Sequence, residues 1–458
     1  MIYNFLLLSE NMPAVPAYLV LPFFLLLGLI ATGPVLFAHF WEHHYRKIAI
    51  ALGLLVLAYY LFVRHDFHMP VETLADYASF AALLSSLYIA AGGIYINANA
   101  RATSFINVMV LVLGAVLANI IGTTGASLLL IRPYIRLNIH RIKTYHIIFF
   151  IFIVSNAGGL LTPLGDPPLF IGFLKGVPFF WTLQHLGLPW LIAIVSLCLI
   201  FYILDKKNKE PDYQPKPEVE QKIDAKTEFY FTGKRNLLWL AVIIGAIFLD
   251  PNVVAGLPHI PFGEMRISFV REVIQLTAAF FCFRFSSKTA LNGNHFTFGP
   301  ILEVVFLFFG IFFTMMPALQ LAAALAASPQ FSHLLNPDTM YWAAGTLSGF
   351  LDNAPTYANF LSLGMAKYNM SYSSVQDVHQ FAYGLAGNPE TYYLLEAISL
   401  GSVLFGAFSY IGNGPNFMVK AIAESAGIKM PSFFKYIISF SIPFLLPVLA
   451  LVYFLIVR

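Results

Sequence analysis

Small and polar residues interrupt the apolar run from residue 145 to residue 174 at Ser155-Asn-Ala-Gly-Gly-Leu-Leu-Thr-Pro-Leu-Gly-Asp-Pro-Pro168. Glycine and proline release backbone N–H and C=O groups from the helical ladder, and hydrocarbon cannot satisfy these groups. Such a break persists in a membrane only where protein or a water-filled cavity surrounds it. The stretch therefore predicts a broken helix beside an internal cavity.

The composition of the whole chain places it in a lipid bilayer. Of its 458 residues, 59% are hydrophobic and 11% are charged, whereas about 25% of the residues of a soluble protein are charged. So few charges cannot cover a globule of this size, but they suffice for the two water-facing ends of a membrane protein. A soluble enzyme is excluded. With 26 Lys and Arg against 23 Asp and Glu, the charge balance also argues against a nucleic-acid partner.

Hydropathy divides the chain into about twelve apolar segments, and we expect an all-α integral membrane protein with about 10–12 transmembrane segments. Segments that contain Gly, Pro, Asn, Ser or Thr are expected to be broken helices or hairpins. No Lys or Arg precedes Arg46, so the first segment is expected to be a retained span and not a secretory signal. The segments lie at about residues 18–40, 47–63, 74–96, 104–131, 145–174, 186–204, 236–250, 268–285, 300–327, 341–366, 391–422 and 432–457.

One long hydrophilic segment, residues 205–235, divides the chain nearly in half. It contains three prolines and eight Lys or Arg, and the positive-inside tendency predicts that it is a cytoplasmic linker. The basic stretch 132–143 is expected on the same side. We therefore expect an N-terminal membrane half, residues 1–204, with a first repeat after one or two extra spans. The C-terminal membrane half, residues 236–458, would hold a second repeat, and inverted repeats are typical of alternating-access carriers.

Each half carries two polar interruptions, in corresponding order. They are Gly122-Thr-Thr-Gly-Ala-Ser127 and residues 155–168 in the first half, and Asp352-Asn-Ala-Pro-Thr356 and Ser409-Tyr-Ile-Gly-Asn-Gly-Pro-Asn416 in the second. Freed N–H groups at half-helix N-termini can face an anion, and freed carbonyl and side-chain oxygens can coordinate a cation. Glycine and proline are also frequent in membrane helices for packing alone. Four breaks in paired order favour a lined cavity.

Two carboxylates belong to these breaks, Asp166 and Asp352. An ionised Asp near the middle of a bilayer costs about 2.5–3.5 kcal/mol, so it usually faces the protein interior and has a function. Neither has an obvious basic partner nearby in the sequence, which suggests that a proton or a bound cation neutralises it. A structural alternative stays open for both, because each carboxylate could cap the half-helix that follows it.

Other ionisable residues carry weaker signals. Lys420 follows Asn416 by about one helical turn and could reach an anionic substrate, although a lysine that extends to the interface is the alternative. Glu303 suits the first turn of a helix, and the role of Glu396 is open. A loop at the membrane surface is expected to hold Glu42, His39, His43 and His44, and we expect no metal site there.

Residues 155–168 resemble the S-N-x-G-G-x-x-T-x-x-G-D-P-P signature of the ion transporter superfamily. That superfamily includes NhaD-type sodium/proton antiporters, arsenite permeases, the melanosomal P protein, and citrate and dicarboxylate carriers. Residues 352–356 resemble its D-N-x-P hairpin tip. Residues 412–427 resemble its second-half G-A-x-x-N-x-x-x-x-G-x-A-E-x-x-G stretch, and residues 308–312 its F-F-x-G-L-F helix. The resemblance extends from about residue 85 to the C-terminus.

The resemblance implies a fold of two inverted repeats, each with a re-entrant hairpin and a broken helix whose tips meet at the substrate. It also implies a homodimer in which a transport domain moves against a scaffold. Residues 122–127 and 352–356 become hairpin tips, and residues 155–156 and 409–413 become break points. The first tip reads Gly-Thr-Thr-Gly where dicarboxylate carriers have Ser-Asn-Thr, and the last motif lacks the Gly-Ala or Gly-Ser pair of many relatives. The chain is therefore nearer to the antiporter and citrate-transporter branches than to the succinate carriers.

Together these features predict a secondary active transporter, most simply a sodium/proton antiporter of the bacterial inner membrane. Asp166 and Asp352 would alternate between a proton and Na⁺ or Li⁺, so that neither carboxylate crosses the bilayer empty and charged. Neutral oxygens would come from Thr123, Thr124, Ser155, Asn156, Asn353, Thr356, Ser409, Asn413 and Asn416.

The alternative within the same architecture is a carrier of citrate, a dicarboxylate or an arsenite-like oxyanion, held by hairpin-tip amides with a cation or with Lys420. An ion channel is less favoured, because no pore-lining ring repeats along the chain. We expect no cofactor and no resident metal beyond a transported cation. We also expect no enzymatic activity, since no HExxH or GxSxG motif occurs.

Overall fold

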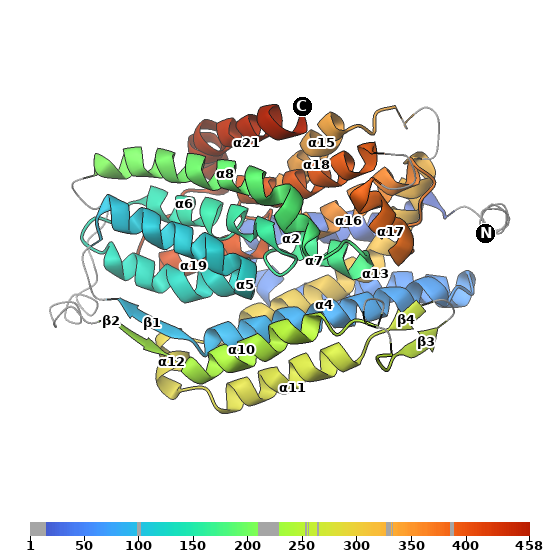
Figure 1. Cartoon of the computed structure of the whole chain (residues 1–458), viewed down its shortest axis with the longest axis horizontal. Helices are drawn as coiled ribbons and strands as arrows, with labels where there is room; N and C mark the ends of the chain where they lie inside the picture. The colour runs from blue at the N-terminus through green and yellow to red at the C-terminus, as the bar shows by residue number, and fades with distance from the viewer. Residues whose placement is uncertain are drawn as a thin grey trace.

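The computed structural model describes residues 15–98, 102–208, 229–251, 254, 256–262, 265–326, 331, 333–384 and 389–458. The described chain is almost entirely helical (Figure 1), which confirms the prediction of an all-α membrane protein. Residues 209–228 of the expected linker lie outside the described residues. Within the described part, eight helical stretches are long and apolar enough to cross a membrane: His39–Val63, His68–Gly92, Ser104–Leu137, Thr144–Leu161, Trp181–Lys206, Gly299–Ala326, Glu390–Phe408 and Phe433–Val457.

The elements before the central segment are mostly long helices. Their bounds are η1 (Ala17–Val20), α2 (Leu21–Leu36), α3 (Ala38–Ala58), η2 (Tyr59–Val63), α4 (His68–Gly92), β1 (Tyr95–Ala98), α5 (Ser104–Leu137), α6 (Thr144–Ile153), η3 (Ala157–Leu161), α7 (Pro167–Lys175) and α8 (Trp181–Lys206). The surface loop expected at His39, His43 and His44 is wrong, because these residues belong to the first two turns of α3. The described residues hold no cluster of three or more metal-ligating side chains.

The elements after the central segment begin with strand β2 and include two shorter helices, α10 and α11, before the long helix α13. Their bounds are β2 (Phe229–Thr232), α10 (Lys234–Ile247), β3 (Ile260–Phe262), β4 (Met265–Ile267), α11 (Val270–Arg284), α12 (Lys288–Gly293), α13 (Gly299–Ala326), α15 (Pro337–Phe350), α16 (Asn353–Ala366), α17 (Val375–Tyr383), α18 (Glu390–Leu404), η4 (Phe405–Phe408), α19 (Gly414–Ser425), α20 (Phe433–Tyr436), η5 (Ile437–Leu445), α21 (Leu446–Val452) and η6 (Tyr453–Val457).

Two small antiparallel ribbons mark opposite ends of the molecule (Figure 1). β1 pairs with β2, and β3 pairs with β4. Helix α4 runs between them: the ring of His68 at its start lies 6.0 Å from that of Phe262 in β3, and Gly92 at its end is followed by β1. We call the two ends of the molecule the β1–β2 end and the β3–β4 end.

Helix α5 is a hairpin and not one continuous helix. Gly122 interrupts it with φ +76°, a conformation that glycine adopts without a steric cost. A straight helix of this length would separate its ends by about 50 Å. Instead, the N–H of Ala102, just before the first arm, donates to the carbonyl oxygen of Leu137 at 2.9 Å. The two arms therefore run side by side, and the expected hairpin tip at residues 122–127 is confirmed.

Helices α15 and α16 form the corresponding hairpin in the second half. Only Leu351 and Asp352 separate them. The Nζ of Lys367, just after α16, donates to the carbonyl oxygen of Leu335, just before α15, at 2.9 Å. The outer ends of both helices thus lie together, and residues 352–356 form the tip and first turn after it, as the resemblance implies.

The two broken helices share one backbone device. In each break a pair of glycines six residues apart brings two backbone segments into contact: a β-carbon on Gly165 would collide with the carbonyl oxygen of Gly159, and one on Gly412 with that of Gly406. The N–H of Thr123 then donates to the oxygen of Gly165 at 2.8 Å, and that of Asn353 donates to the oxygen of Gly412 at 3.2 Å. Each hairpin tip is therefore bonded to the broken helix of its own half.

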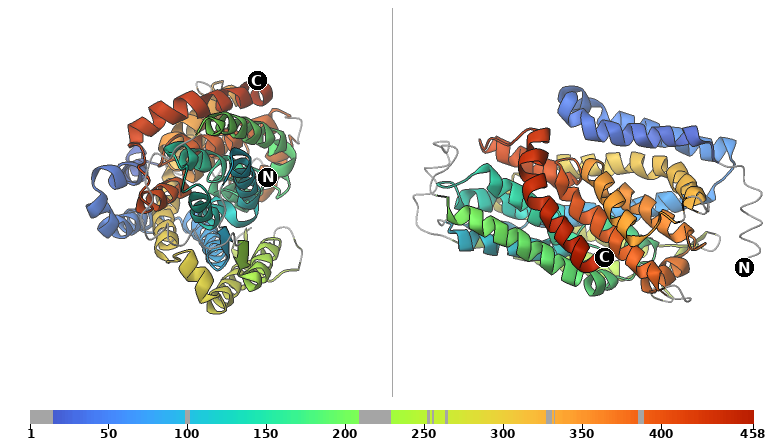
Figure 2. Two further views of the ribbon diagram at one scale, coloured as in Figure 1. Left: turned by 90° about the vertical axis from the view of Figure 1, so that its left-hand side faces the viewer. Right: turned by 90° about the horizontal axis from the view of Figure 1, so that it is seen from above.

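The order of elements repeats as well. A long helix, a hairpin, a broken helix and a further long helix occur as α4, α5, α6–α7 and α8, and again as α13, α15–α16, α18–α19 and the run from α20 to η6. Helices α2 and α3 lie together beside α13 (Figure 2). The inverted orientation of the two repeats stays a prediction.

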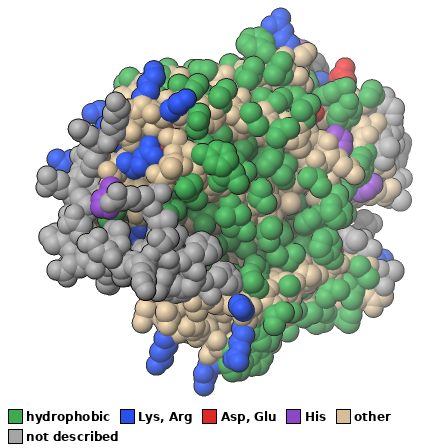
Figure 3. All heavy atoms as spheres, turned by 60° about the vertical axis from the view of Figure 1, so that its left-hand side comes forward, with side chains coloured by type: hydrophobic (Ala, Val, Ile, Leu, Met, Phe, Trp, Pro, Cys, Tyr) green, Lys and Arg blue, Asp and Glu red, His purple; other side chains and the backbone are tan. Residues whose placement is uncertain are grey.

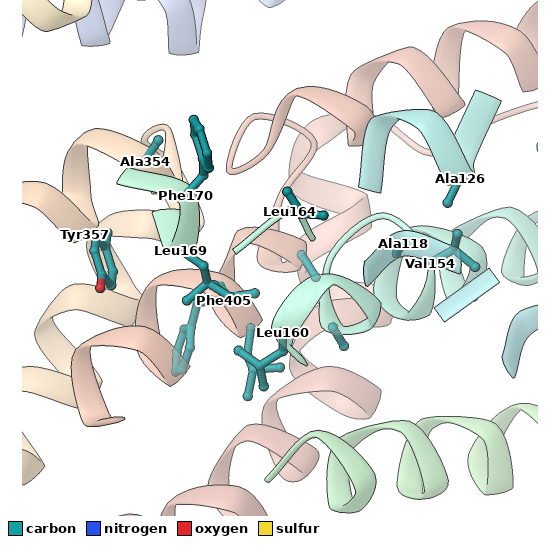
Figure 4. Packing of buried hydrophobic residues seen from close by; sticks show 14 of the residues in the cluster. Ala118, Ala126, Val154, Leu160, Leu164, Leu169, Phe170, Ala354, Tyr357 and Phe405 are labelled. Carbon is teal, nitrogen blue, oxygen red and sulfur yellow. The ribbon is translucent and has the colours of Figure 1, made fainter. Parts of the chain in front are cut away.

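The breaks are embedded in the core, while the outer surface is apolar. Figure 4 shows Leu160 and Leu164 of the first break between Ala118 of α5 and Phe405 of the second half, all of them buried. Figure 3 shows a broad hydrophobic surface with Lys and Arg side chains at its margins. Large apolar side chains such as Phe62, Leu238 and Phe434 are exposed, as expected for helices that face lipid.

Candidate transport site

The carboxylate of Asp166 is the centre of the polar interior. Its side chain is 1% exposed. Oδ1 accepts hydrogen bonds from Oγ1 of Thr123 at 2.9 Å and from Nδ2 of Asn413 at 2.8 Å, and Oδ2 accepts one from Nδ2 of Asn353 at 2.6 Å. These four residues come from the four polar interruptions, one from each. The two hairpins and the two broken helices therefore meet at one carboxylate.

A second row of amides lies behind this centre and satisfies the freed backbone groups. Nδ2 of Asn413 also approaches Oδ1 of Asn156 at 3.2 Å, and Nδ2 of Asn156 donates to Oδ1 of Asn416 at 2.7 Å. Asn416 in turn donates to the carbonyl oxygens of Gly406 and Ser409 at 2.8 and 2.9 Å. Because Asn156 and Asn416 each donate and accept, the row links the two breaks to each other.

Asn353 leaves one oxygen unsatisfied beside Asp166. Its Nδ2 must face the carboxylate, which only accepts hydrogen bonds, so its Oδ1 points elsewhere. That Oδ1 is buried and has no donor among the described residues. No Lys, Arg or His of the described chain lies within ion-pair distance of Asp166. A buried negative charge with a free carbonyl oxygen nearby is the donor set of a small cation or a proton site.

Asp352 has a different role from Asp166. Its Oδ1 accepts a hydrogen bond from the N–H of Ala354 at 3.0 Å, so it caps α16. Asp166 occupies the same N-cap position before α7, but its carboxylate makes no capping bond. The capping alternative that the sequence leaves open for both residues thus holds for Asp352 alone. Asp352 also lines the cavity described below.

The remaining predicted ligands lie near the centre without contacting its carboxylate. Oγ1 of Thr356 donates to the backbone oxygen of Asp352 at 2.9 Å. Oγ of Ser155 lies 2.8 Å from Oγ of Ser127, and Oγ of Ser409 accepts from the N–H of Ile411 at 3.1 Å. Their hydroxyls stabilise the breaks, whereas Thr124 faces the cavity.

A cavity of about 500 Å³ adjoins this centre on one side. It begins at the hairpin tips, where Thr123 and Asn413 separate it from Asp166, and extends towards the β1–β2 end as far as Gly92 and Asn294. A volume of this size fits a small organic ligand. The walls come from α4 and α13 on one side and from α5 and α19 on the other.

Arg132 is a candidate that the sequence does not single out, since it appears there only as the first residue of the basic stretch 132–143. In the structure it belongs to the second arm of α5 and lines the cavity. The apolar run of residues 128–131 directly before it is the signal of a continuing helix. Lys420, the cation considered for an anionic substrate, pairs with Glu424 at 3.1 Å and does not line this cavity.

The opposite side of the centre is closed. Only about 30 Å³ of space remains between α4, α7 and α13 towards the β3–β4 end. There, Nζ of Lys175 contacts carboxylate oxygens of Glu72 at 2.6 Å and Asp76 at 2.5 Å. The large cavity therefore lies on one side of the centre and the ion cluster on the other.

Comparison with known proteins agrees with this geometry. A family model described as "Putative citrate transport" matches residues 12–457, nearly the whole chain. None of the curated proteins compared with the chain matches it.

Proposed function

We propose that this chain, which belongs to the citrate-transport family and is a multi-pass secondary transporter, carries a citrate-like carboxylate. A cation or proton held at Asp166 would accompany the carboxylate. One observation carries the proposal: a buried carboxylate without a cationic partner lies directly behind a cavity of about 500 Å³. A bare cation does not need a cavity of that size, whereas a tricarboxylate does.

Helix N-termini make the inner end of the cavity suitable for an anion. Helix α19 begins at Gly414 and the second arm of α5 begins after Gly122, and both glycines line the cavity. The first N–H groups of a helix lack intrahelical partners and carry a partial positive charge, so they attract carboxylates. The substrate would therefore bind with one carboxylate group against the hairpin tips.

Asp166 would couple this substrate to a cation. An anionic substrate beside a buried aspartate is strongly repelled unless a cation or proton neutralises the aspartate. Thr123, Asn353 and Asn413 belong to three different elements, so occupation of Asp166 changes the packing of both hairpin tips. Loading of the two sites then becomes interdependent, and by linkage the effect is reciprocal.

A second candidate is the sodium/proton antiporter predicted from the sequence. The unpaired Oδ1 of Asn353 favours it, because this buried oxygen near Asp166 is a possible cation ligand that needs no organic substrate. The inner-membrane location, the homodimer and the cytoplasmic orientation of the β1–β2 end stay predictions.

Reconstituted transport separates the two candidates. Purified protein in liposomes would be given labelled citrate with a sodium or a pH gradient, while an interior dye reports pH. Citrate uptake that depends on either gradient, and that is lost in Asp166→Asn, is the expected result. A sodium- or lithium-evoked pH change without citrate uptake would overturn the proposal in favour of the antiporter. Liposomes without protein are the control.

A further inference from the structure

Arg132 is the cavity-lining cation with a vacant hydrogen-bonding position. Its Nη1 is buried, yet no described residue accepts a hydrogen bond from it. The cavity also contains the carboxylates of Glu303 and Asp352, but neither forms an ion pair with Arg132 in the described structure. A buried guanidinium donor without an acceptor is costly, and an incoming anion would remove that cost.

Arg136 lies one helical turn after Arg132 in α5, and its hydrogen bonds indicate a structural role. Its Nη1 donates to the hydroxyl of Tyr95 at 3.1 Å, and its Nη2 donates to the carbonyl oxygen of Ile96 at 3.2 Å. Its guanidinium also lies 5.5 Å from the centre of the Tyr95 ring. Arg136 thus anchors α5 to β1 through both Nη atoms, although its Nε also lacks an acceptor among the described residues. Arg132 differs because it lines the cavity and no described hydrogen bond holds its Nη1.

The position of Arg132 along α5 defines an outer end of the cavity. It follows Gly122 by ten residues, which corresponds to about 15 Å along the helix. Side chains of a helix lean towards its N-terminus, and the N-terminus of this arm is the hairpin tip. The guanidinium therefore lies closer to the tip than its own backbone does. The cavity then offers two anion-binding ends, the helix N-termini at the tips and Arg132 further out.

We propose that Arg132 binds a second carboxylate group of the substrate and makes the carrier selective for dicarboxylates and tricarboxylates over monocarboxylates. The inference rests on the proposed carboxylate transport. A guanidinium binds a carboxylate through two parallel N–H donors, so it fixes the orientation as well as the charge of that group. A monocarboxylate held at the tips has no group to place there.

Uptake measurements on Arg132→Gln and Arg132→Lys test the inference. In Arg132→Gln, the KM for citrate should rise about 10- to 100-fold, because one charged hydrogen-bonded contact is lost. The KM for a monocarboxylate such as acetate should change little. Arg132→Lys should be intermediate for citrate, since lysine keeps the charge but not the paired donors. Arg136→Gln is the matched control and should leave the citrate-to-acetate KM ratio unchanged.

The outcomes distinguish the two proposals. If the wild type takes up no carboxylate, the proposed function fails and the role of Arg132 fails with it. If the wild type takes up citrate but Arg132→Gln lowers Vmax equally for all carboxylates, or leaves the KM ratio unchanged, the inference alone is wrong. A thermal shift by citrate, measured on detergent-purified wild type and Arg132→Lys, provides a second readout that does not depend on transport. An equal shift in both proteins would contradict the inference.

Discussion

The two sides of the polar centre are built on the same three helices and differ in how their charges are satisfied. Helices α4 and α13 line both sides, and α7, which begins directly after Asp166, contributes Pro167 to one side and Lys175 to the other. On the β1–β2 side they help to enclose about 500 Å³, and on the β3–β4 side only about 30 Å³. The open side has Arg132 with an unpaired donor, and the closed side has Lys175 between two carboxylates. Lys175 is thus paired on the closed side, whereas Nη1 of Arg132 has no acceptor among the described residues on the open side.

Aromatic rings separate the two sides. Phe80 of α4 stacks on Phe308 of α13 with ring centroids 4.6 Å apart, and it lies 5.4 Å from Phe312 and 6.2 Å from Phe170 of α7. Phe308 faces the cavity and Phe312 the closed side. The barrier is therefore a packed cluster about one side chain thick, which is consistent with a site that alternates between two exposures.

Helix α7 connects the two sides directly. It begins after Asp166 and ends at Lys175, nine residues later, which is about 13 Å. Neutralisation of Asp166 at one end and opening of the ion cluster at the other would thus act on one short rigid element. This arrangement indicates how occupation of the centre could control the closed side.

The largest expected effect comes from Asp166→Asn. Three hydrogen bonds to a charged group are lost or weakened, and such bonds contribute about 1.5–3 kcal/mol each. Transport should fall at least about 100-fold. Labelled citrate uptake and the sodium-evoked pH signal in liposomes both measure the loss. Uptake above about one tenth of the wild-type rate would show that Asp166 is not the coupling group.

Lys175→Gln should open the closed side. The substitution leaves Glu72 and Asp76 as two adjacent carboxylates in place of a compensated cluster, and breaking a buried pair costs about 3–5 kcal/mol. A cysteine introduced at Thr73, which lines the closed side, should react with a water-soluble maleimide about tenfold faster in this background. Lys367→Gln is a matched control, because Lys367 bonds only the carbonyl oxygen of Leu335 among the described polar groups and lies outside this cluster. Equal labelling rates in both backgrounds would argue against the ion cluster as a closure.

Phe80→Ala should weaken the barrier between the two sides. Phe80 is 1% exposed, and removal of a buried ring leaves a void that neighbouring side chains fill only in part. We expect a severalfold lower steady-state accumulation of citrate at similar initial rates, since substrate and coupling ion leak back. Phe80→Leu keeps most of the volume and should accumulate citrate almost normally. Similar accumulation in Phe80→Ala and wild type would place the barrier elsewhere.

The smallest effect is expected for Asp352→Asn. Asparagine caps a helix about as well as aspartate, so the bond to the N–H of Ala354 can be retained. Citrate uptake should change by no more than about threefold, and the melting temperature in detergent should stay nearly constant. A complete loss of transport in Asp352→Asn would instead support the coupling role that the sequence suggests for Asp352.

The sequence predicts the local features of the site well. Each of the eight helical stretches long enough to cross a membrane overlaps an apolar segment found from hydropathy. The glycine, proline and polar residues at 122–127 and 352–356 identify the hairpin tips. These signals are local, because a backbone that leaves the helical ladder inside a membrane needs particular residues at that position. The roles of the two aspartates could not be separated in this way, since both precede a helix start and both could cap it.

A helical membrane protein with four paired breaks follows from the sequence alone, because burial of backbone groups in hydrocarbon constrains each segment independently. Which groups meet at the centre follows from the packing of the helices. The partners of Asp166 lie 187 and 247 residues away in Asn353 and Asn413, and Arg132 faces a cavity whose other wall is α13. Such contacts depend on how distant helices pack, and no periodicity or motif within one segment encodes that packing.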